Sequence, residues 1–209
     1  MGRYTGSVCR QCRALGKKLF LKGQRCYSEK CSFERRQTPP GPKRRRGKAT
    51  DYSVHLKEKQ IGRRVFGIYE RQFRNYFIRA KASKGVTGEE LVRQLETRLD
   101  NVIFRLGWAS SRALARQLVL HRHFKVNGRV VNIPSYGVSV GDKIEVKDSR
   151  RKTAYFREQK ELVESLPADH WLKCDLENWT AQVERLPETG EMEDSFDPAL
   201  IVEYYSKLV

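Results

Sequence analysis

Four cysteines near the start of the chain are the residues best suited to chemistry. Cys9 and Cys12 form one close pair, Cys26 and Cys31 form a second, and the whole pattern is C-x2-C-x13-C-x4-C. Two close pairs joined by a short loop can supply four thiolates to one tetrahedral zinc ion. The intervening loop is basic and has too few apolar side chains to fold alone, so metal binding would supply its folding free energy. We therefore expect one zinc ion with these four ligands.

Other uses of the cysteines remain open. A disulfide pair or free thiols would need no metal, whereas a redox C-x-x-C is disfavoured because no βαβ pattern precedes Cys9. The first 20 residues carry five basic side chains and no apolar signal core, so we expect a reducing, cytoplasmic compartment, which favours zinc over disulfides. Bacterial and organelle-encoded proteins would look alike in this respect. Cys174 stands alone in an apolar stretch and is interpreted as a packing residue.

The charge of the chain points to a polyanionic partner. Its 209 residues include 42 Lys and Arg against 25 Asp and Glu, a net charge of +17. Residues 1–50 carry +13, residues 51–100 carry +4, residues 101–150 carry +6, and residues 151–209 carry −6. No apolar run approaches the ~18 residues of a membrane span. We expect the first 150 residues to face nucleic acid and the acidic last third to face protein or solvent.

A basic linker follows the cysteines. Residues 34–48 contain three prolines and two glycines, which exclude a regular helix or strand, and end in a run of Lys and Arg. We expect an extended arm along RNA phosphates. A solvated, disordered linker and a nuclear localisation signal are the alternatives.

Residues 51–97 show the periodicity of three helices. Asp51 is a plausible N-cap for a helix to about residue 65, a second helix is predicted over 68–82, and Thr87 opens a third with a capping box. Tyr69, Phe73, Tyr76 and Phe77 recur at helical spacing in the second helix. They could stack on bases, but this spacing is more typical of a core.

Residues 98–147 predict a helix pair followed by a small sheet. An apolar face runs to Gly107, Ser110 or Ser111 caps the next helix, and Asp100 is interpreted as an N-cap. Asn127-Gly128 predicts a two-residue type I′ hairpin turn, and residues 144–146 a last strand. The helix pair is expected to present a basic face that recognises RNA by shape and phosphate. Its predicted members are Arg98, Arg105, Arg112, Arg116 and His123.

The last third predicts further elements of the same sheet. We expect a helix over 154–166 and short strands over 171–175 and 181–185 that extend the sheet. Asp197-Pro198 is a cap followed by proline at the first helical position, which opens a final helix. The acidic loop 188–194 could meet a basic neighbouring protein or only solvent.

Sequence blocks along nearly the whole chain carry a family resemblance. In order they are MGRYTG, the four cysteines, ERRQTPPG, DYSVHLKEKQ, ERQFRNYF, KGVTGEELVRQLETRLDNVIFRLG, ARQLVLHRHFKVNGR, PSYGVSVGD and IVEYYSK. Residues 98–147 resemble the S4 RNA-binding module, and the chain resembles the bacterial-type ribosomal protein S4 family. The resemblance implies a structural constituent of the small ribosomal subunit and a primary binder of 16S-type rRNA that nucleates subunit assembly. It also implies neighbouring ribosomal proteins as partners, a place near the channel through which messenger RNA enters, and an influence on translational accuracy.

The resemblance further implies zinc on Cys9, Cys12, Cys26 and Cys31, as in the four-cysteine members of the family. The expected fold class is α+β, with no membrane and no homo-oligomer. It comprises a zinc-bound extension with a basic arm (1–50), a helical domain (51–97) joined by the C-terminal helix (197–209), and an RNA-binding module with a sheet extension (98–196).

Two departures from the family pattern bear on the RNA contacts. The sequence has Gly41-Pro42-Lys43-Arg44 where the family usually continues Pro-Pro-Gly-Gln-His-Gly. Arg122 stands where the family often has glycine, so we expect either an altered helix end or an added phosphate contact.

The residues expected to contact RNA lie in the basic segments and offer positive charge or hydrogen bonds. They are Arg3, Arg13, Lys22, Arg35, Arg36, Lys43, Arg44, Arg45, Arg46, Lys48, Lys59, Arg63, Arg71, Arg74, Arg98, Arg105, Ser111, Arg112, Arg116, Gln117, His121, Arg122, His123, Lys125, Asn127 and Arg129.

Two other classes of protein were weighed. Pseudouridine synthases carry the same module and a catalytic aspartate in an R-L-D motif, and Arg98-Leu99-Asp100 is such a tripeptide. Here it opens the module, and only 62 residues follow position 147, too few for that catalytic domain. We therefore expect no enzyme and no catalytic residues. A zinc-finger DNA-binding regulator would need a recognition helix at defined spacing, which the sequence lacks.

Overall fold

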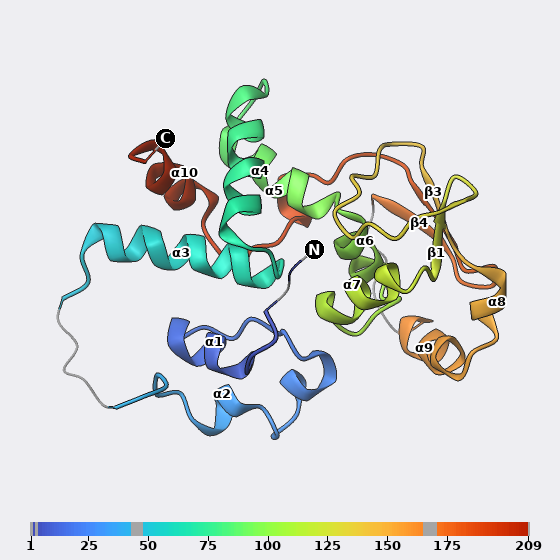
Figure 1. Ribbon diagram of the computed structural model, residues 1–209, viewed down its shortest axis with the longest axis horizontal. Helices are drawn as coiled ribbons and strands as arrows, with labels where there is room; N and C mark the ends of the chain where they lie inside the picture. Colours follow the sequence, from blue (N-terminus) through green and yellow to red (C-terminus); the bar gives the residue numbers. More distant parts are fainter. Residues whose placement is uncertain (1, 3, 43–47, 165–170, 209) are drawn as a thin grey trace. The chain divides into compact units, whose positions relative to one another are not determined.

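The protein is described from a computed structural model covering residues 2, 4–42, 48–164 and 171–208 (Figure 1). It divides into two units. The helical unit comprises residues 1–92 and 193–209, and the sheet unit comprises residues 93–192. The N-terminal segment therefore belongs with the helices, and the division falls at 92 instead of the expected 97. The last turn of the third helix joins the sheet unit because Glu96 binds Asn101 and Arg105.

The helical unit is built from short N-terminal helices and four longer ones. Its elements are α1 (Cys9–Leu15), a 3-10 helix (Gly23–Tyr27), α2 (Ser32–Arg35), α3 (Asp51–Val65), α4 (Glu70–Ala82), α5 (Thr87–Glu96) and α10 (Pro198–Ser206). The predicted N-cap of α3 is wrong by one residue: Thr50 Oγ1 accepts a hydrogen bond from Ser53 N at 3.3 Å. Asp51 lies instead in the first turn, where its charge favours the helix dipole. Asp197 caps α10 as predicted, accepting from Ala199 N.

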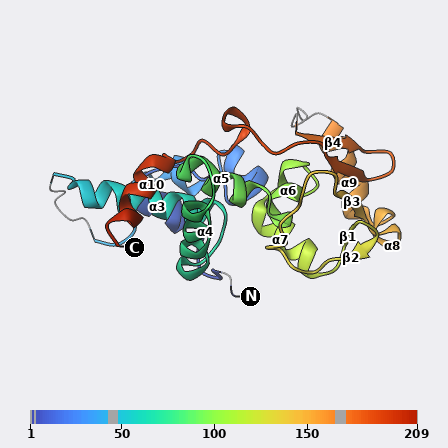
Figure 2. The same ribbon diagram turned by 90° about the horizontal axis from the view of Figure 1, so that it is seen from above.

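The last helix returns to the other helices of this unit, as expected. The rings of Tyr205 and Phe77 stack with centroids 4.8 Å apart, and Phe73 lies beside them, fully buried. At Gly62 of α3 an added Cβ would lie 3.3 Å from Ile201, so glycine lets α10 approach closely. Figures 1 and 2 both show α10 beside α3. The aromatic side chains of α4 that sequence spacing assigned to a core, Phe73, Tyr76 and Phe77, are indeed buried.

The sheet unit combines a helix pair with a five-stranded antiparallel sheet. Its elements are α6 (Leu99–Arg105), α7 (Arg112–Leu120), β1 (Phe124–Val126), β2 (Arg129–Val130), β3 (Lys143–Val146), α8 (Asp148–Arg151), α9 (Ala154–Glu164), β4 (Leu172–Asp175), β5 (Thr180–Val183) and a 3-10 turn (Thr189–Glu191). Within the described residues the strand order is β2-β1-β3-β5-β4. The two late strands extend the sheet as predicted, because β5 pairs with β3. Asn127 and Gly128 have φ of 49° and 78°, as a type I′ turn requires.

Aromatic side chains fill the core of the sheet unit. Trp108, Phe124, Phe156 and Trp179 contact one another with ring centroids 5.1–6.3 Å apart. The helix α9 is fixed to the turn between α6 and α7: Tyr155 donates to the Trp108 carbonyl at 3.0 Å, and Gln159 to the Gly107 carbonyl at 2.7 Å. Residues 165 and 166 of the predicted helix lie outside the described residues. Among the helices described, none is both long and apolar enough to cross a membrane.

Arg122 sits in a backbone conformation that suits glycine. Its φ is +59°, just after the end of α7, and its amide donates to the Val119 carbonyl. A side chain in the left-handed region costs about 1–2 kcal/mol. This observation confirms that the helix end needs a permissive residue.

Replacing Arg122 with Gly should raise the free energy of unfolding by about 0.5–1 kcal/mol, because relief of strain exceeds the added unfolded-state entropy of glycine. Urea denaturation measures the change. Arg74→Gly, with the same loss of charge but inside α4, is the matched control and should destabilise by about 1 kcal/mol. If Arg122→Gly lowered the free energy of unfolding, the backbone at Arg122 would not be strained.

Candidate RNA interface

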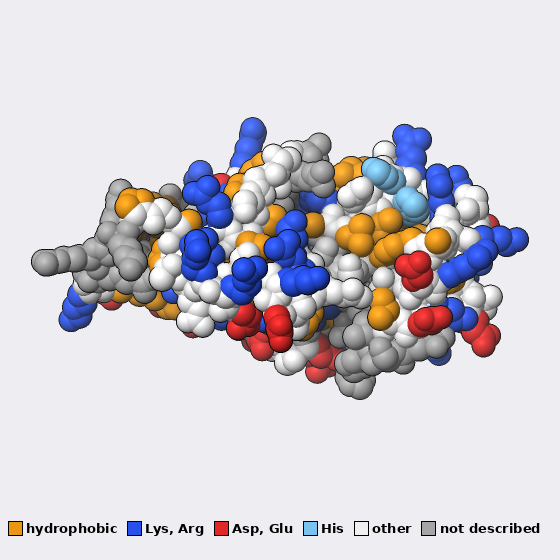
Figure 3. All heavy atoms as spheres, turned by 90° about the horizontal axis from the view of Figure 1, so that it is seen from below, with side chains coloured by type: hydrophobic (Ala, Val, Ile, Leu, Met, Phe, Trp, Pro, Cys, Tyr) orange, Lys and Arg blue, Asp and Glu red, His pale blue; other side chains and the backbone are white. Residues whose placement is uncertain are grey.

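One face of α4 is exposed and basic. Arg71, Arg74, Arg79 and Lys81 are all exposed, whereas the opposite face is buried. Within the helical unit, Figure 3 shows Lys and Arg side chains gathered on the surface. The predicted contacts Arg71 and Arg74 are therefore available to a phosphate backbone.

Two predicted members of the basic face of the helix pair lie in the core instead. Arg98 is 1% exposed and Arg116 is 6% exposed. Both bind Asp100: Arg98 Nη2 lies 2.7 Å and Arg116 Nη1 lies 3.3 Å from Oδ2. Asp100 is therefore no N-cap but an ion-pair partner inside α6, whose N-cap is Arg98. The expectation of an exposed face at these two arginines is wrong, because burial requires each charge to be paired.

A second hydrogen-bond network binds the other two predicted arginines of the helix pair, Arg105 and Arg112. Arg105 binds both oxygens of the buried Glu96 carboxylate, at 2.9 and 2.7 Å. Asn101 donates to the Glu96 carbonyl and accepts from Arg112 Nε at 2.7 Å. The Arg112 guanidinium also lies 4.5 Å from the centre of the Phe104 ring. These side chains fix α6 against α5 and α7.

In the helical unit, the Glu70 carboxylate lies close to two more of the predicted RNA contacts, Lys59 and Arg63. Lys59 Nζ lies 2.8 Å and Arg63 Nε 3.8 Å from its carboxylate, and Tyr205 donates to it at 2.7 Å. Burial alone would raise the pKa of Glu70, but the hydrogen bonds from Lys59 and Tyr205 outweigh it and the pKa is lowered. Lys59 also lies over the ring of Tyr204 and is buried, so it acts within the fold.

The end of α7 and the hairpin carry most of the accessible predicted residues of the sheet unit. Gln117, His121, Arg122 and Arg129 are exposed. Figure 3 shows histidine side chains beside hydrophobic and basic ones on this unit. Ser111 is used as a helix cap, accepting from Leu114 N at 3.3 Å.

The other predicted RNA contacts of this surface are partly buried or already bind neighbouring side chains. His123 is half-buried, and burial, followed by the nearby Arg150 and His121, lowers its pKa, so that it is neutral at neutral pH. Lys125 pairs with Asp148 at 3.1 Å. Asn127 donates to Asp142 at 2.8 Å.

The N-terminal segment leaves several predicted contacts exposed. Lys22, Arg35, Arg36 and Lys48 are exposed, and Arg13 Nε donates to the Thr38 carbonyl at 2.9 Å. The other predicted contacts of this segment lie outside the described residues. They are Arg3, Lys43, Arg44, Arg45 and Arg46.

The four clustered cysteines line one small cavity of about 10 Å³. Burial first, and then the sulfurs of Cys26, Cys9 and Cys31, raise the pKa of the Cys12 thiol. All five cysteines are free, so the structure holds no disulfide. Among the described residues, no group of three or more His, Cys, Asp or Glu is arranged to hold a metal ion. Cys174 is half-buried against the aromatic core, as a packing residue should be.

Sequence reasoning passed over Arg10 and Arg64. Both line a second cavity in the helical unit, together with Tyr4 and Tyr69. Arg64 Nη1 donates to the Gln11 carbonyl at 3.4 Å, across 53 positions of sequence. The adjacent arginines Arg63 and Arg64 were the sequence signal for a basic site. Helical spacing alone could not show that the N-terminal segment lies against them.

The buried Arg98–Asp100–Arg116 cluster yields a stability prediction. Arg98→Ala leaves Asp100 buried with one partner and should lower the free energy of unfolding by about 3–5 kcal/mol. Arg71→Ala, on the exposed face of α4, is the control and should change it by less than about 0.5 kcal/mol. Chemical denaturation of both variants measures this. Equal small effects would mean that Arg98 is not structural.

Comparison with known proteins agrees with this geometry. Residues 3–96 match the family described as ribosomal protein S4/S9 N-terminal domain, and residues 97–144 match the S4 domain. The chain is 53% identical over 209 residues to small ribosomal subunit protein uS4 of Syntrophomonas wolfei. It is 51% identical over 208 residues to the proteins of the same name from Thermodesulfovibrio yellowstonii and Halothermothrix orenii. Each comparison covers 99% of this chain and 100% of the relative. The chain therefore belongs to the uS4 family of small ribosomal subunit proteins.

Proposed function

We propose that this chain is a structural constituent of the small ribosomal subunit and binds the rRNA of that subunit in the cytoplasm. The observation that carries the proposal is the full-length match to uS4 proteins at about half identity. The exposed arginines of α4 supply the positive charge that a phosphate backbone requires. Because the relatives are named as ribosomal proteins over their whole length, the role is structural and the pseudouridine synthase alternative is not supported.

The finer parts of the function rest on the family resemblance. The protein would bind rRNA early and nucleate assembly, contact neighbouring ribosomal proteins, and lie near the channel through which messenger RNA enters. The acidic loop suits a basic protein neighbour because Arg185 binds Glu191 at two points, which gives the loop a fixed shape. Glu188 and Asp194 remain exposed on it.

The RNA proposal predicts specific, salt-dependent binding. The protein should bind 5′-domain rRNA of the small subunit better than an equal-length control RNA, with an affinity that falls steeply with salt. Arg71→Ala with Arg74→Ala should reduce the slope of log affinity against log salt by about 1.4–1.8, because two phosphate contacts are lost. Filter binding at several salt concentrations measures both quantities.

The matched control carries Arg157→Ala and Lys173→Ala, which remove the same charge from exposed positions in the acidic third. This variant should keep the wild-type slope. Equal affinity of the wild type for both RNAs would reduce the protein to an unspecific polycation.

We further propose that Cys9, Cys12, Cys26 and Cys31 bind one zinc ion in a structural site. Its support is that four thiols line one cavity with room for about one water-sized sphere. Four thiolates are the donor set of structural zinc sites. The four side chains would have to shift to reach one ion, since no described cluster is arranged around a metal as it stands. Bound zinc would cross-link α1 to the segment that carries Cys26 and Cys31.

Metal analysis tests this proposal. Purified protein should contain about one zinc per chain, and Cys26→Ser should lose it together with thermal stability of the helical unit. Cys174→Ser, outside the cavity, is the control and should keep the metal. Absence of zinc together with four reactive thiols would overturn the proposal.

A further inference from the structure

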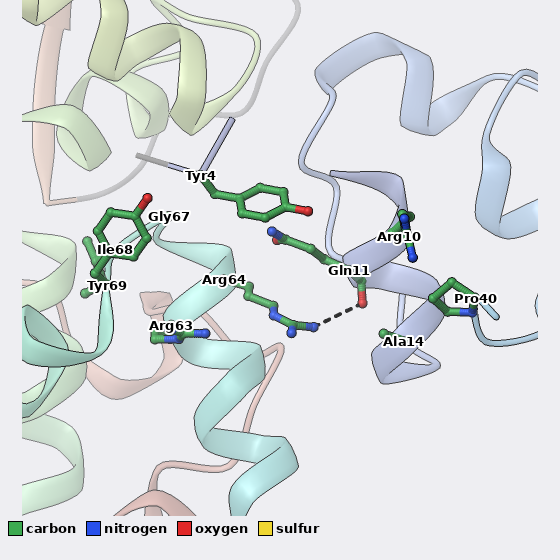
Figure 4. A pocket seen from close by; sticks show the side chains of 10 residues that line it. All are labelled: Tyr4, Arg10, Gln11, Ala14, Pro40, Arg63, Arg64, Gly67, Ile68 and Tyr69. Carbon is green, nitrogen blue, oxygen red and sulfur yellow. Dashed lines mark hydrogen bonds between the residues drawn. The ribbon is translucent and has the colours of Figure 1, made fainter. Parts of the chain in front are cut away.

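A cavity of about 320 Å³ opens in the helical unit between the N-terminal segment and the junction of α3 with α4 (Figure 4). Arg10 and Gln11 of α1 line one side, and Arg63 and Arg64 of α3 line the other. In Figure 4 the side chain of Arg64 extends from α3 toward Gln11, and the ring of Tyr4 extends toward the same residue. None of the described lining residues is acidic.

The charge of this cavity is incompletely neutralised. Arg63 Nε is buried and finds no hydrogen-bond partner among the described residues, with the Glu70 carboxylate 3.8 Å away. That carboxylate already binds Lys59 and Tyr205. Arg64 is partly desolvated, and burial followed by the charge of Arg63 lowers its pKa. Three guanidinium groups on one concave surface therefore favour an anion, and guanidinium geometry matches phosphate.

Two tyrosine rings complete the cavity. Tyr4 and Tyr69 are 49% and 48% exposed, so each ring has both a packed and an accessible part. Glycines make room for them. An added Cβ would lie 2.6 Å from the Tyr4 hydroxyl at Gly6, and 2.8 Å from the Tyr69 ring at Gly2. Any other residue at either glycine would displace a ring. Exposed aromatic faces beside cationic groups are platforms on which nucleic acid bases stack.

We propose that this cavity receives one unstacked nucleotide of the bound rRNA. Its phosphate would lie on Arg10, Arg63 and Arg64, and its base against Tyr4 or Tyr69. This inference deepens the proposed function and rests on it. The cavity volume is at the lower end of the range for small-ligand sites, which suits a single nucleotide and excludes a duplex. An isolated basic patch would bind phosphate alone, whereas the two tyrosine rings that line this cavity point to base stacking as well.

Paired substitutions of Tyr4 test the base contact. Tyr4→Ala should weaken binding to 5′-domain rRNA by about 5- to 150-fold at every salt concentration, because stacking involves no counterion release. Tyr4→Phe keeps the ring and should bind within about twofold of wild type. Tyr27→Ala, at an exposed aromatic residue outside the cavity, should also bind like wild type. Thermal melts of each variant confirm that the fold is retained. If Tyr4→Ala melts early, Tyr69→Ala against Tyr69→Phe supplies the same comparison.

An exposed arginine tests the phosphate contact. Arg10→Gln should reduce the salt slope by about 0.7–0.9, as the loss of one phosphate contact requires. Chemical probing of the RNA should show one base that wild type protects and Tyr4→Ala does not.

The outcomes separate this inference from the function on which it rests. If wild type fails to prefer rRNA over the control RNA, the proposed function itself is wrong. If wild type prefers rRNA but the Tyr4 and Tyr69 variants match Tyr27→Ala, and no base loses protection, the cavity takes no nucleotide and only this inference falls. A reduced salt slope in Arg10→Gln, without any effect of the tyrosine substitutions, would mean that the cavity binds phosphate but no base. That outcome also overturns the proposal of a bound nucleotide.

Discussion

Loss of hydration requires this protein, whose net charge is +17, to pair each cation that its core encloses. In the described residues the buried cations are Lys59, Arg98 and Arg116. Each has a carboxylate partner, Glu70 for Lys59 and Asp100 for the two arginines. An unpaired buried ion would cost several kcal/mol, a large share of the stability of an ordinary domain. The positions of a few carboxylates therefore decide which cations serve the fold and which remain available to RNA.

The same carboxylates also set the geometry of the surfaces on which the accessible cations lie. Asp100 joins α6 to α7, and Glu96 joins the end of α5 to α6 through Asn101 and Arg105. Glu70 joins α3 to α4 and, through Tyr205, to α10. The exposed arginines of α4 and the polar residues at the end of α7 are carried by these elements. Internal ion pairs thus position the elements that carry the exposed cations.

The sequence predicted the helices and strands well, but it predicted poorly whether a given charged side chain is exposed or paired inside the fold. Apolar periodicity located the helix pair, because it buries a face of recognisable spacing. Asn127-Gly128 located the hairpin and Asp197-Pro198 the start of the last helix, whereas the family resemblance implied the return of that helix to the others. Arg116 shares a helix face with Arg112, which suggested a common basic surface. Spacing gives only relative direction, however, and Asp100, 16 residues earlier, becomes the partner of Arg116 when α6 and α7 pack. Asp100 was itself interpreted as a cap, since an aspartate near a helix start fits either role. Thr50 and Asp51 show the same ambiguity, whereas the left-handed backbone at Arg122 was foreseeable from the usual glycine.

The N-terminal segment poses the sharpest physical problem, because it holds much of the charge and little of the core. Its helices have 7, 5 and 4 residues, too short to be stable alone, and three of its buried side chains are thiols. Contacts such as Lys18 with Glu34 are partly exposed and contribute little. A ligand bound to this segment would therefore add to its order. A zinc ion on the thiols and a phosphate on Arg10 would order the same α1 helix from two sides. Each would then lower the entropic cost that the other has to meet, so that metal and RNA are expected to bind cooperatively.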